Sequence, residues 1–299
     1  MGNLGTTVYK RCAQAAGGRN MLVYQCEDSI EGIFTAIYRI YEDKNNNKEC
    51  RISTDEELFL FAEYIRTEPD RVKTVKVIRT LQREFGEEDY LRICYALASE
   101  DAEKATAVYE SVAYGLQHKV RPGHLFDNLA KPFLHKVFSL ARSTGNEVHH
   151  LQGFIRFRQE ERGFLYAPIG PKNNVLTFLM PHFADRLPGE YFIIYDEKRG
   201  IFGVHPAFRQ WYLVQQQEDG LTDFEETAEE GLYSDLFRHF CNSIAIKERR
   251  NLKLQRSLLP LRFREYMVEF GENPKGSTDV LNPIRDDLTT SEGWGTMKW

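Results

Sequence analysis

The clearest pattern of hydrophobic and polar positions in this chain lies in residues 147–205. Short runs of β-forming apolar residues alternate there with polar turns, and one apolar stretch at helical spacing, 174–187, stands between them. The predicted order is strand, turn, strand, helix, strand, turn, strand. Neighbouring strands joined by short turns favour antiparallel pairing, so we expect an antiparallel sheet with one inserted helix. Pro181 predicts a kink or a break in that helix.

The chain before this unit shows mainly helical periodicity. Residues 21–24 are short and β-prone, and they predict a single strand. Apolar residues then recur at helical spacing over 33–41, which predicts a helix whose N-cap is Asp28 or Ser29.

Residues 54–144 continue in the same way, with apolar stripes three and four positions apart. Gly86 is a candidate stop for one of these helices, and Gly145 is a candidate stop for the last of them. The first half of the chain is therefore predicted to be an α-rich bundle joined to one strand.

These patterns together predict an α+β fold with an α-rich N-terminal half, a central antiparallel sheet with one inserted helix, and basic C-terminal helices. We expect a single domain over residues 21–270, with an α-rich subdomain over 21–145 and a sheet and C-terminal helix subdomain over 146–270. Residues 1–20 are expected to form a disordered extension, and residues 271–299 a disordered tail.

Charge reverses sharply near the end of this domain. Residues 218–235 hold eight acids and no Lys or Arg, whereas residues 236–264 hold eight Lys or Arg and one acid. Clustered cations with amides between them suit contacts to nucleic-acid phosphates. The predicted contacts are Lys247, Arg249, Arg250, Asn251, Lys253 and Gln255. The alternative is a solvated helix face that pairs with the acidic segment upstream.

A second group of candidate nucleic-acid contacts lies on the predicted sheet. Arg156 and Arg158 alternate there with Phe154 and Phe157, a pattern typical of surfaces that stack bases and hold phosphates. Arg199, in the predicted hairpin loop, would extend that surface. The alternative is that the phenylalanines belong to the core and that the arginines form salt bridges.

Acid or base chemistry has three candidates, His149, His182 and Asp196, because the predicted elements of one unit carry all three. Adjacent histidines such as His149 and His150 cannot share one face of a regular element, and their spacing matches no known zinc motif. We therefore predict no metal site, and no cofactor motif is present. A structural role for these histidines, and a buried pair between Asp196 and an arginine, remain open alternatives.

Composition narrows the class of protein further. The five cysteines are widely spaced and odd in number, which is typical of free thiols in a reducing compartment. No apolar run approaches the roughly 20 residues that a membrane-spanning helix needs. We therefore expect a cytoplasmic protein that does not enter a membrane. The formal net charge of −5 does not by itself indicate nucleic-acid binding.

Three linked blocks carry a family resemblance. They are MLVYQCEDSIEGIFTAIYRIYE, HHLQGFIRFRQEERGFLYAPIGPKNNVLTFLMPHFADRLPGEYFIIYDEKRGI and IKERRNLKLQRSLLPLRFREYM. Over residues 21–270 the chain resembles a bacterial family of proteins assigned to DNA metabolism or DNA repair. Its members are encoded beside radical-SAM proteins similar to DNA photoproduct lyases, and a related domain is fused to uracil-DNA glycosylase-type proteins. The resemblance implies a DNA-repair context and no established reaction.

One position departs from the family pattern. That pattern has a glutamate, a histidine and then an arginine or similar residue before the G-F-x-R-F element. The matching residues here are Glu147, His149, Gly153, Phe154, Arg156 and Phe157. His150 stands where the arginine is usual, which removes a fixed positive charge.

Three functions follow as expectations. The first is a DNA-binding accessory protein that works with a radical-SAM repair enzyme. The second is an enzyme that acts on a damaged base or nucleotide. The third is a protein-interaction scaffold for the radical-SAM partner, with the acidic segment and the basic arm as its docking surface.

Overall fold

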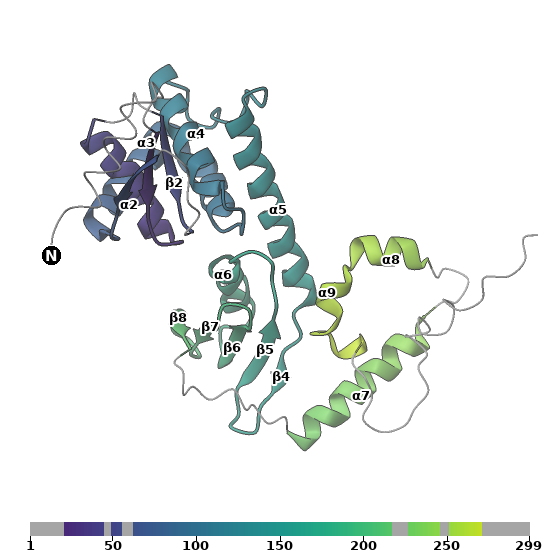
Figure 1. Ribbon diagram of the computed structural model, residues 1–299. Helices are drawn as coiled ribbons and strands as arrows, with labels where there is room; N and C mark the ends of the chain where they lie inside the picture. The colour runs from purple at the N-terminus through teal and green to yellow at the C-terminus, as the bar shows by residue number, and fades with distance from the viewer. Residues whose placement is uncertain (1–20, 45–48, 56–61, 217–226, 246–250, 271–299) are drawn as a thin grey trace, which may run out of the picture. The chain divides into compact units, whose positions relative to one another are not determined.

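The computed structural model describes residues 21–44, 49–55, 62–216, 227–245 and 251–270 (Figure 1). The chain divides into two compact units. The first comprises residues 1–147 and 172–175, and the second comprises residues 148–171 and 176–299. Each unit contains helices and one sheet, so the predicted α+β class is confirmed.

The first unit contains a three-stranded parallel sheet of order β2-β1-β3. Its strands are β1 (Met21–Gln25), β2 (Cys50–Ser53) and β3 (Ala62–Arg66). The prediction of a single N-terminal strand was therefore wrong. The two missed strands are short and carry exposed or half-buried charged residues, so their alternation is weak.

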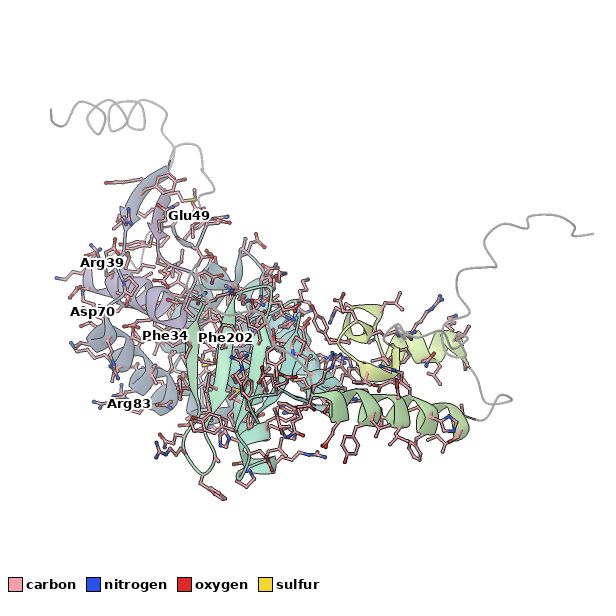
Figure 2. All side chains as sticks on the ribbon, turned by 90° about the horizontal axis from the view of Figure 1, so that it is seen from below. Phe34, Arg39, Glu49, Asp70, Arg83 and Phe202 are labelled. Atoms are coloured by element: carbon pink, nitrogen blue, oxygen red, sulfur yellow. The ribbon has the colours of Figure 1, made fainter. Side chains whose placement is uncertain are left out.

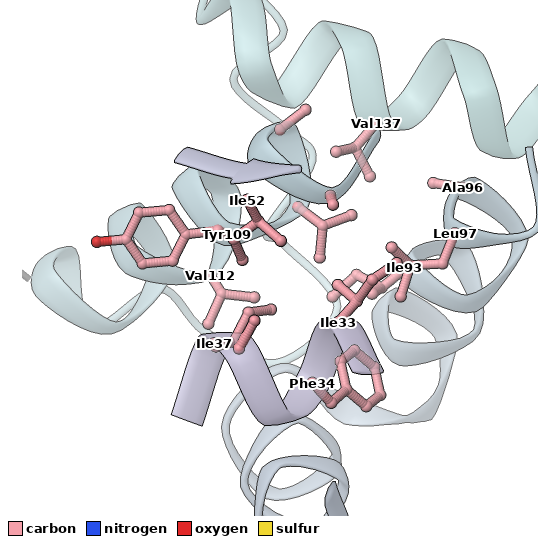
Figure 3. Close-up of a cluster of buried hydrophobic side chains, with 14 of the residues drawn as sticks. Ile33, Phe34, Ile37, Ile52, Ile93, Ala96, Leu97, Tyr109, Val112 and Val137 are labelled. Carbon is pink, nitrogen blue, oxygen red and sulfur yellow. The ribbon is translucent and has the colours of Figure 1, made fainter. Parts of the chain in front are cut away.

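Helix α2 (Ile30–Glu42) connects β1 to β2, as parallel pairing requires. Ser29, one of the two predicted N-caps, accepts a hydrogen bond from the backbone amide of Gly32. The α2 residues Ile33, Phe34 and Ile37 are buried. They enter a hydrophobic cluster with side chains of β2 and of three further helices (Figure 3).

Those helices are α3 (Arg71–Leu97), α4 (Lys104–His118) and α5 (Pro132–Phe154). The predicted stop at Gly86 is confirmed as a break inside α3, where the glycine has a φ of 81°. The predicted stop at Gly145 was wrong, because α5 continues to Phe154. Buried apolar residues after the glycine, Val148 and Leu151, offset its cost of about 1 kcal/mol in a helix interior.

The second unit contains a five-stranded sheet of order β4-β5-β6-β7-β8. Its elements are β4 (Arg158–Gln159), β5 (Leu165–Ile169), α6 (Leu176–Arg186), β6 (Phe192–Asp196), β7 (Ile201–His205) and β8 (Tyr212–Gln215). The predicted order of strands, turns and inserted helix is confirmed. The helix contains Pro181 without ending there.

The prediction of a wholly antiparallel sheet was wrong. Strands β5 and β6 pair in parallel, with Ala167 opposite Ile194, because α6 crosses over between them. The pairs β4–β5, β6–β7 and β7–β8 are antiparallel as expected. The first predicted strand is also reduced to two residues, and Arg156 and Phe157 precede it.

The C-terminal part of this unit is helical. It consists of α7 (Ala228–Ser243), α8 (Leu252–Leu258), α9 (Leu261–Arg264) and a 3-10 turn, η2 (Val268–Phe270). Helix α7 packs against η2. In the part of the chain that the structure describes, every helix is too short or too polar to cross a lipid bilayer.

Candidate nucleic-acid interface

The five-stranded sheet has two faces of different character. Helix α6 packs on one of them: Met180 and Leu176 lie so close to Gly203 that a Cβ at that position would collide with Met180. Phe192, Ile194 and the other side chains on this face of the three central strands are largely buried. This face therefore belongs to the core.

The opposite face is rich in aromatic residues. The strand register places Arg158 beside Tyr166 and Tyr195 beside Phe202, and puts Tyr212 on the same side of the sheet. Only Tyr195 in this set is buried, and Tyr212 is 48% exposed. Phe202 can be found on the sheet in Figure 2. We call Arg158, Tyr166, Tyr195, Phe202 and Tyr212 the aromatic face.

Two of these rings are stacked on each other. The rings of Tyr195 and Phe202 have centroids 4.4 Å apart and an interplanar angle of 16°. The Tyr195 hydroxyl donates a hydrogen bond of 2.7 Å to Gln216, which helps to fix the position of its ring. Tyr166, Phe202 and Tyr212 are half-buried or exposed, and aromatic rings that remain accessible on a sheet are the type of surface on which unpaired bases stack.

The phenols of Tyr166 and Tyr195 stay neutral at physiological pH. Burial raises the pKa of Tyr166, and the charge of Glu197 raises it further, while the nearby positive charge of Arg158 acts in the opposite direction. Burial also raises the pKa of Tyr195. Neutral phenols keep their hydroxyl protons and can donate hydrogen bonds, and they bring no negative charge to repel a phosphate.

Another exposed aromatic residue lies in a loop of the same unit. Phe208 lies between β7 and β8, and its side chain is 84% exposed. Its φ of 58° is unusual for a bulky residue, and its amide donates a hydrogen bond of 2.7 Å to Pro188. A large ring that is held outwards in a strained conformation is typical of a binding surface.

Arg156, predicted as a phosphate contact, lies between other parts of the second unit. Its guanidinium forms two contacts with Glu269, of 2.8 and 3.3 Å, and donates a hydrogen bond of 2.8 Å to Gly153. It also lies 6.0 Å from the ring centroid of Phe237. These contacts match the alternative reading, in which the arginine forms a salt bridge that holds the C-terminal helices.

Arg199 and Asp196 form a pair within the β6–β7 hairpin. The guanidinium lies 3.1 Å from the Asp196 carboxylate and donates to the carbonyl oxygen of Pro171 at 3.2 Å. Asp196 is completely buried, and desolvation raises its pKa although Arg199 opposes that shift. The buried pair that the sequence left open as an alternative is therefore present, and it joins the hairpin to the loop before α6.

The three acid and base candidates are not joined to one another. His149 is exposed on α5, and His182 lies on α6 with its ring against Phe183. Among the described residues, no hydrogen bond or ion pair connects any two of His149, His182 and Asp196. Within the same part of the chain, no three His, Cys, Asp or Glu side chains are grouped to hold a metal ion.

His150, which replaces the usual arginine of the resembled family, belongs to an aromatic cluster. Its ring is stacked on Phe154 with centroids 5.7 Å apart, and the edge of Phe263 approaches it at 6.2 Å. His150, which lies on α5, therefore packs against α9.

The basic arm is only partly described. Lys247, Arg249 and Arg250 lie outside the described residues. Asn251 is the N-cap of α8, with its side chain accepting the amide of Leu254 at 3.0 Å. Lys253 is exposed and Gln255 is half-buried. Lys253 therefore keeps an exposed position suited to phosphate contact, whereas Asn251 serves first to begin the helix.

Sequence reasoning missed most of the aromatic face. The signal was available in the alternation of residues 192–196 and 201–205, which predicts that Tyr195 and Phe202 point to one side of their strands. The parallel pairing of β5 with β6, which aligns Tyr166 with this row, depends on the crossover through α6 and could not be read from alternation alone.

Comparison with known proteins identifies a family, and the function of that family is unknown. The family model DUF4130, described as a domain of unknown function, matches residues 102–269. This match includes the whole five-stranded sheet and the C-terminal helices. No curated protein matches the chain.

Proposed function

Since the chain belongs to the DUF4130 family, whose function is unknown, we propose a function from its own residues: it binds unpaired DNA as an accessory protein in DNA repair. The observation that carries this proposal is the aromatic face, where stacked and half-buried rings lie beside Arg158 on one side of a sheet. The bases would stack on the rings, and the phosphates would lie along Arg158 and the exposed cations of the unit.

The DNA-repair context rests on the resemblance in the three linked sequence blocks. That resemblance also supports a radical-SAM repair enzyme as the partner. Co-purification of the two proteins with and without nuclease treatment tests this part separately, because an association through DNA is lost after nuclease and a direct contact is kept.

We include in the proposed surface the exposed ring of Phe208, in the loop between β7 and β8. Arg156 and Arg199 are left out of it, because Arg156 holds the C-terminal helices through Glu269 and Arg199 joins the β6–β7 hairpin to the loop before α6. Stacking is therefore expected to supply more of the affinity than phosphate contacts do.

The test is fluorescence anisotropy with a short labelled single strand and the same sequence as a duplex. We expect the single strand to bind more tightly, because duplex bases are not free to stack on protein rings. Tyr166→Leu combined with Phe202→Leu removes two rings and keeps apolar volume on the sheet. This variant should weaken binding at least about 30-fold, at about 1–3 kcal/mol for each of two stacked bases.

The matched control is Tyr38→Leu, which removes a half-buried ring from α2 in the first unit. It should leave the affinity unchanged, and far-UV circular dichroism should show that every variant is folded. Arg158→Gln should reduce the slope of log affinity against log salt by about 1. Wild-type affinity in the double ring variant would remove the proposal.

A further inference from the structure

Helix α7 has its polar side turned towards its own unit. Glu230 accepts a hydrogen bond of 2.9 Å from the backbone amide of Gln159, and Arg238 donates one of 3.0 Å to the carbonyl oxygen of Val268. Ser234 lies between them on the same side of the helix and is buried. The contacts that fix α7 are therefore mainly polar.

The apolar side of α7 faces away from the unit. Five large side chains on it are between 54% and 62% exposed: Leu232, Tyr233, Leu236, Phe240 and Ile244, the last of which directly follows the helix. Their spacing of three and four residues makes one continuous stripe. An apolar stripe of this length on a helix surface is typical of a protein-interaction site.

Helix α8 presents a second apolar surface in the same chain. None of its residues is buried, and Leu252, Leu254 and Leu258 are between 37% and 62% exposed. The exposed fractions of the α7 and α8 side chains are those in a single copy of the chain, which contains both helices. The α8 of the same copy therefore leaves the apolar side of α7 uncovered.

The two surfaces carry opposite charge. Helix α7 has the exposed acid Glu229 beside the stripe, and Asp235, which also forms an ion pair with Arg238, whereas α8 has Lys253 and Arg256 and no acid. Opposite charge beside complementary apolar residues favours one pairing of helices over others. One chain thus holds both halves of a possible interface.

We propose that the apolar side of α7 is a docking surface for a second copy of this chain, and that the segment that binds there is α8 of that copy. A two-fold axis would make the contact twice, since each copy supplies one α7 and one α8. The dimer would bury both exposed apolar surfaces and place the α7 acids near the α8 cations.

The first test is the mass of the full chain in solution, by analytical ultracentrifugation over a range of concentrations. We expect a species of twice 34.9 kDa. Leu236→Ala combined with Phe240→Ala should weaken the dimer by at least about 30-fold, the effect of truncating one strong interface residue. Both side chains are exposed in the single copy, so the variant is expected to fold.

The matched control is Val72→Ala combined with Leu91→Ala. These two side chains are also exposed on a helix, α3, in the first unit. The control should dimerise as the wild type does. A monomer at every concentration, or a dimer equally stable in the α7 variant and the control, overturns the docking surface.

The second test identifies the segment that binds. A mixture of isotope-labelled and unlabelled chains is treated with a carbodiimide, which joins a lysine amine directly to a carboxylate. We expect cross-links between Lys253 of one copy and Glu229 or Asp235 of the other, recognised by their mixed isotope content. A dimer in which these cross-links join only residues of one copy, or do not form, overturns the assignment of α8.

Discussion

At the scale of single residues, buried polar groups explain more of this structure than the candidate catalytic residues do. Glu147 is 2% exposed and accepts hydrogen bonds from the amides of Lys172 and Asn173 and from the Asn173 side chain, at 2.7–2.9 Å. It thereby holds residues 172–175 within the first unit. The sequence singled out this glutamate only as part of a histidine block.

Replacement of Glu147 should therefore destabilise the first unit. Glu147→Ala leaves three donors, two of them buried, without this acceptor, and we expect a loss of about 3 kcal/mol or more in the free energy of unfolding. Glu147→Gln keeps one acceptor oxygen but turns an NH₂ group towards donors, so its loss should be smaller. Urea unfolding followed by circular dichroism measures both.

The control for this series is Glu161→Ala, at an exposed position in the turn between β4 and β5. Its effect should stay within about 0.5 kcal/mol, as for most surface substitutions. Equal stability of Glu147→Ala and this control would show that the buried carboxylate is not an anchor.

At the scale of elements, local pattern predicted most helices and the strand order of the second unit. Local pattern gave wrong predictions where contacts with distant parts of the chain determine whether a segment is a helix or a strand. A glycine was expected to end a helix at residue 145, yet α5 continues because later residues of the helix are buried. Strands β2 and β3 were missed because their residues carry charges and become strands only by pairing on each side of β1.

Two helical glycines should respond to alanine in opposite directions. In α4, a Cβ at Gly115 would lie 2.5 Å from Phe85 and 2.7 Å from Leu125. Overpacking there costs about 1–3 kcal/mol, which exceeds the gain of about 1 kcal/mol in helix propensity. In α5, a Cβ at Gly145 would meet no atom within 4 Å, so only the gain remains.

Thermal unfolding of the two variants measures this difference. Gly115→Ala should lower the melting temperature and Gly145→Ala should raise it. A higher melting temperature for Gly115→Ala would mean that α4 has room beside Phe85, which would contradict the packing described here.

At the scale of the whole molecule, the sequence predicted the α+β class better than it predicted the arrangement of the candidate site residues. Alternation predicts that Tyr195 and Phe202 share a side of their strands. It does not predict which side a helix covers, since that depends on the crossover through α6. The arginines that stood out in the sequence, Arg156 and Arg199, are paired with acids in the folded chain.

The central claim is that unpaired bases lie on the aromatic face, and photo-cross-linking tests it most directly. A single strand containing 5-iodouracil is bound to the wild-type chain and irradiated, and the adducts are located by mass spectrometry. Iodouracil reacts with aromatic side chains in contact with it, so we predict adducts on Tyr166, Phe202 or Tyr212. Adducts confined to residues outside β5–β8, with binding intact, would contradict this account.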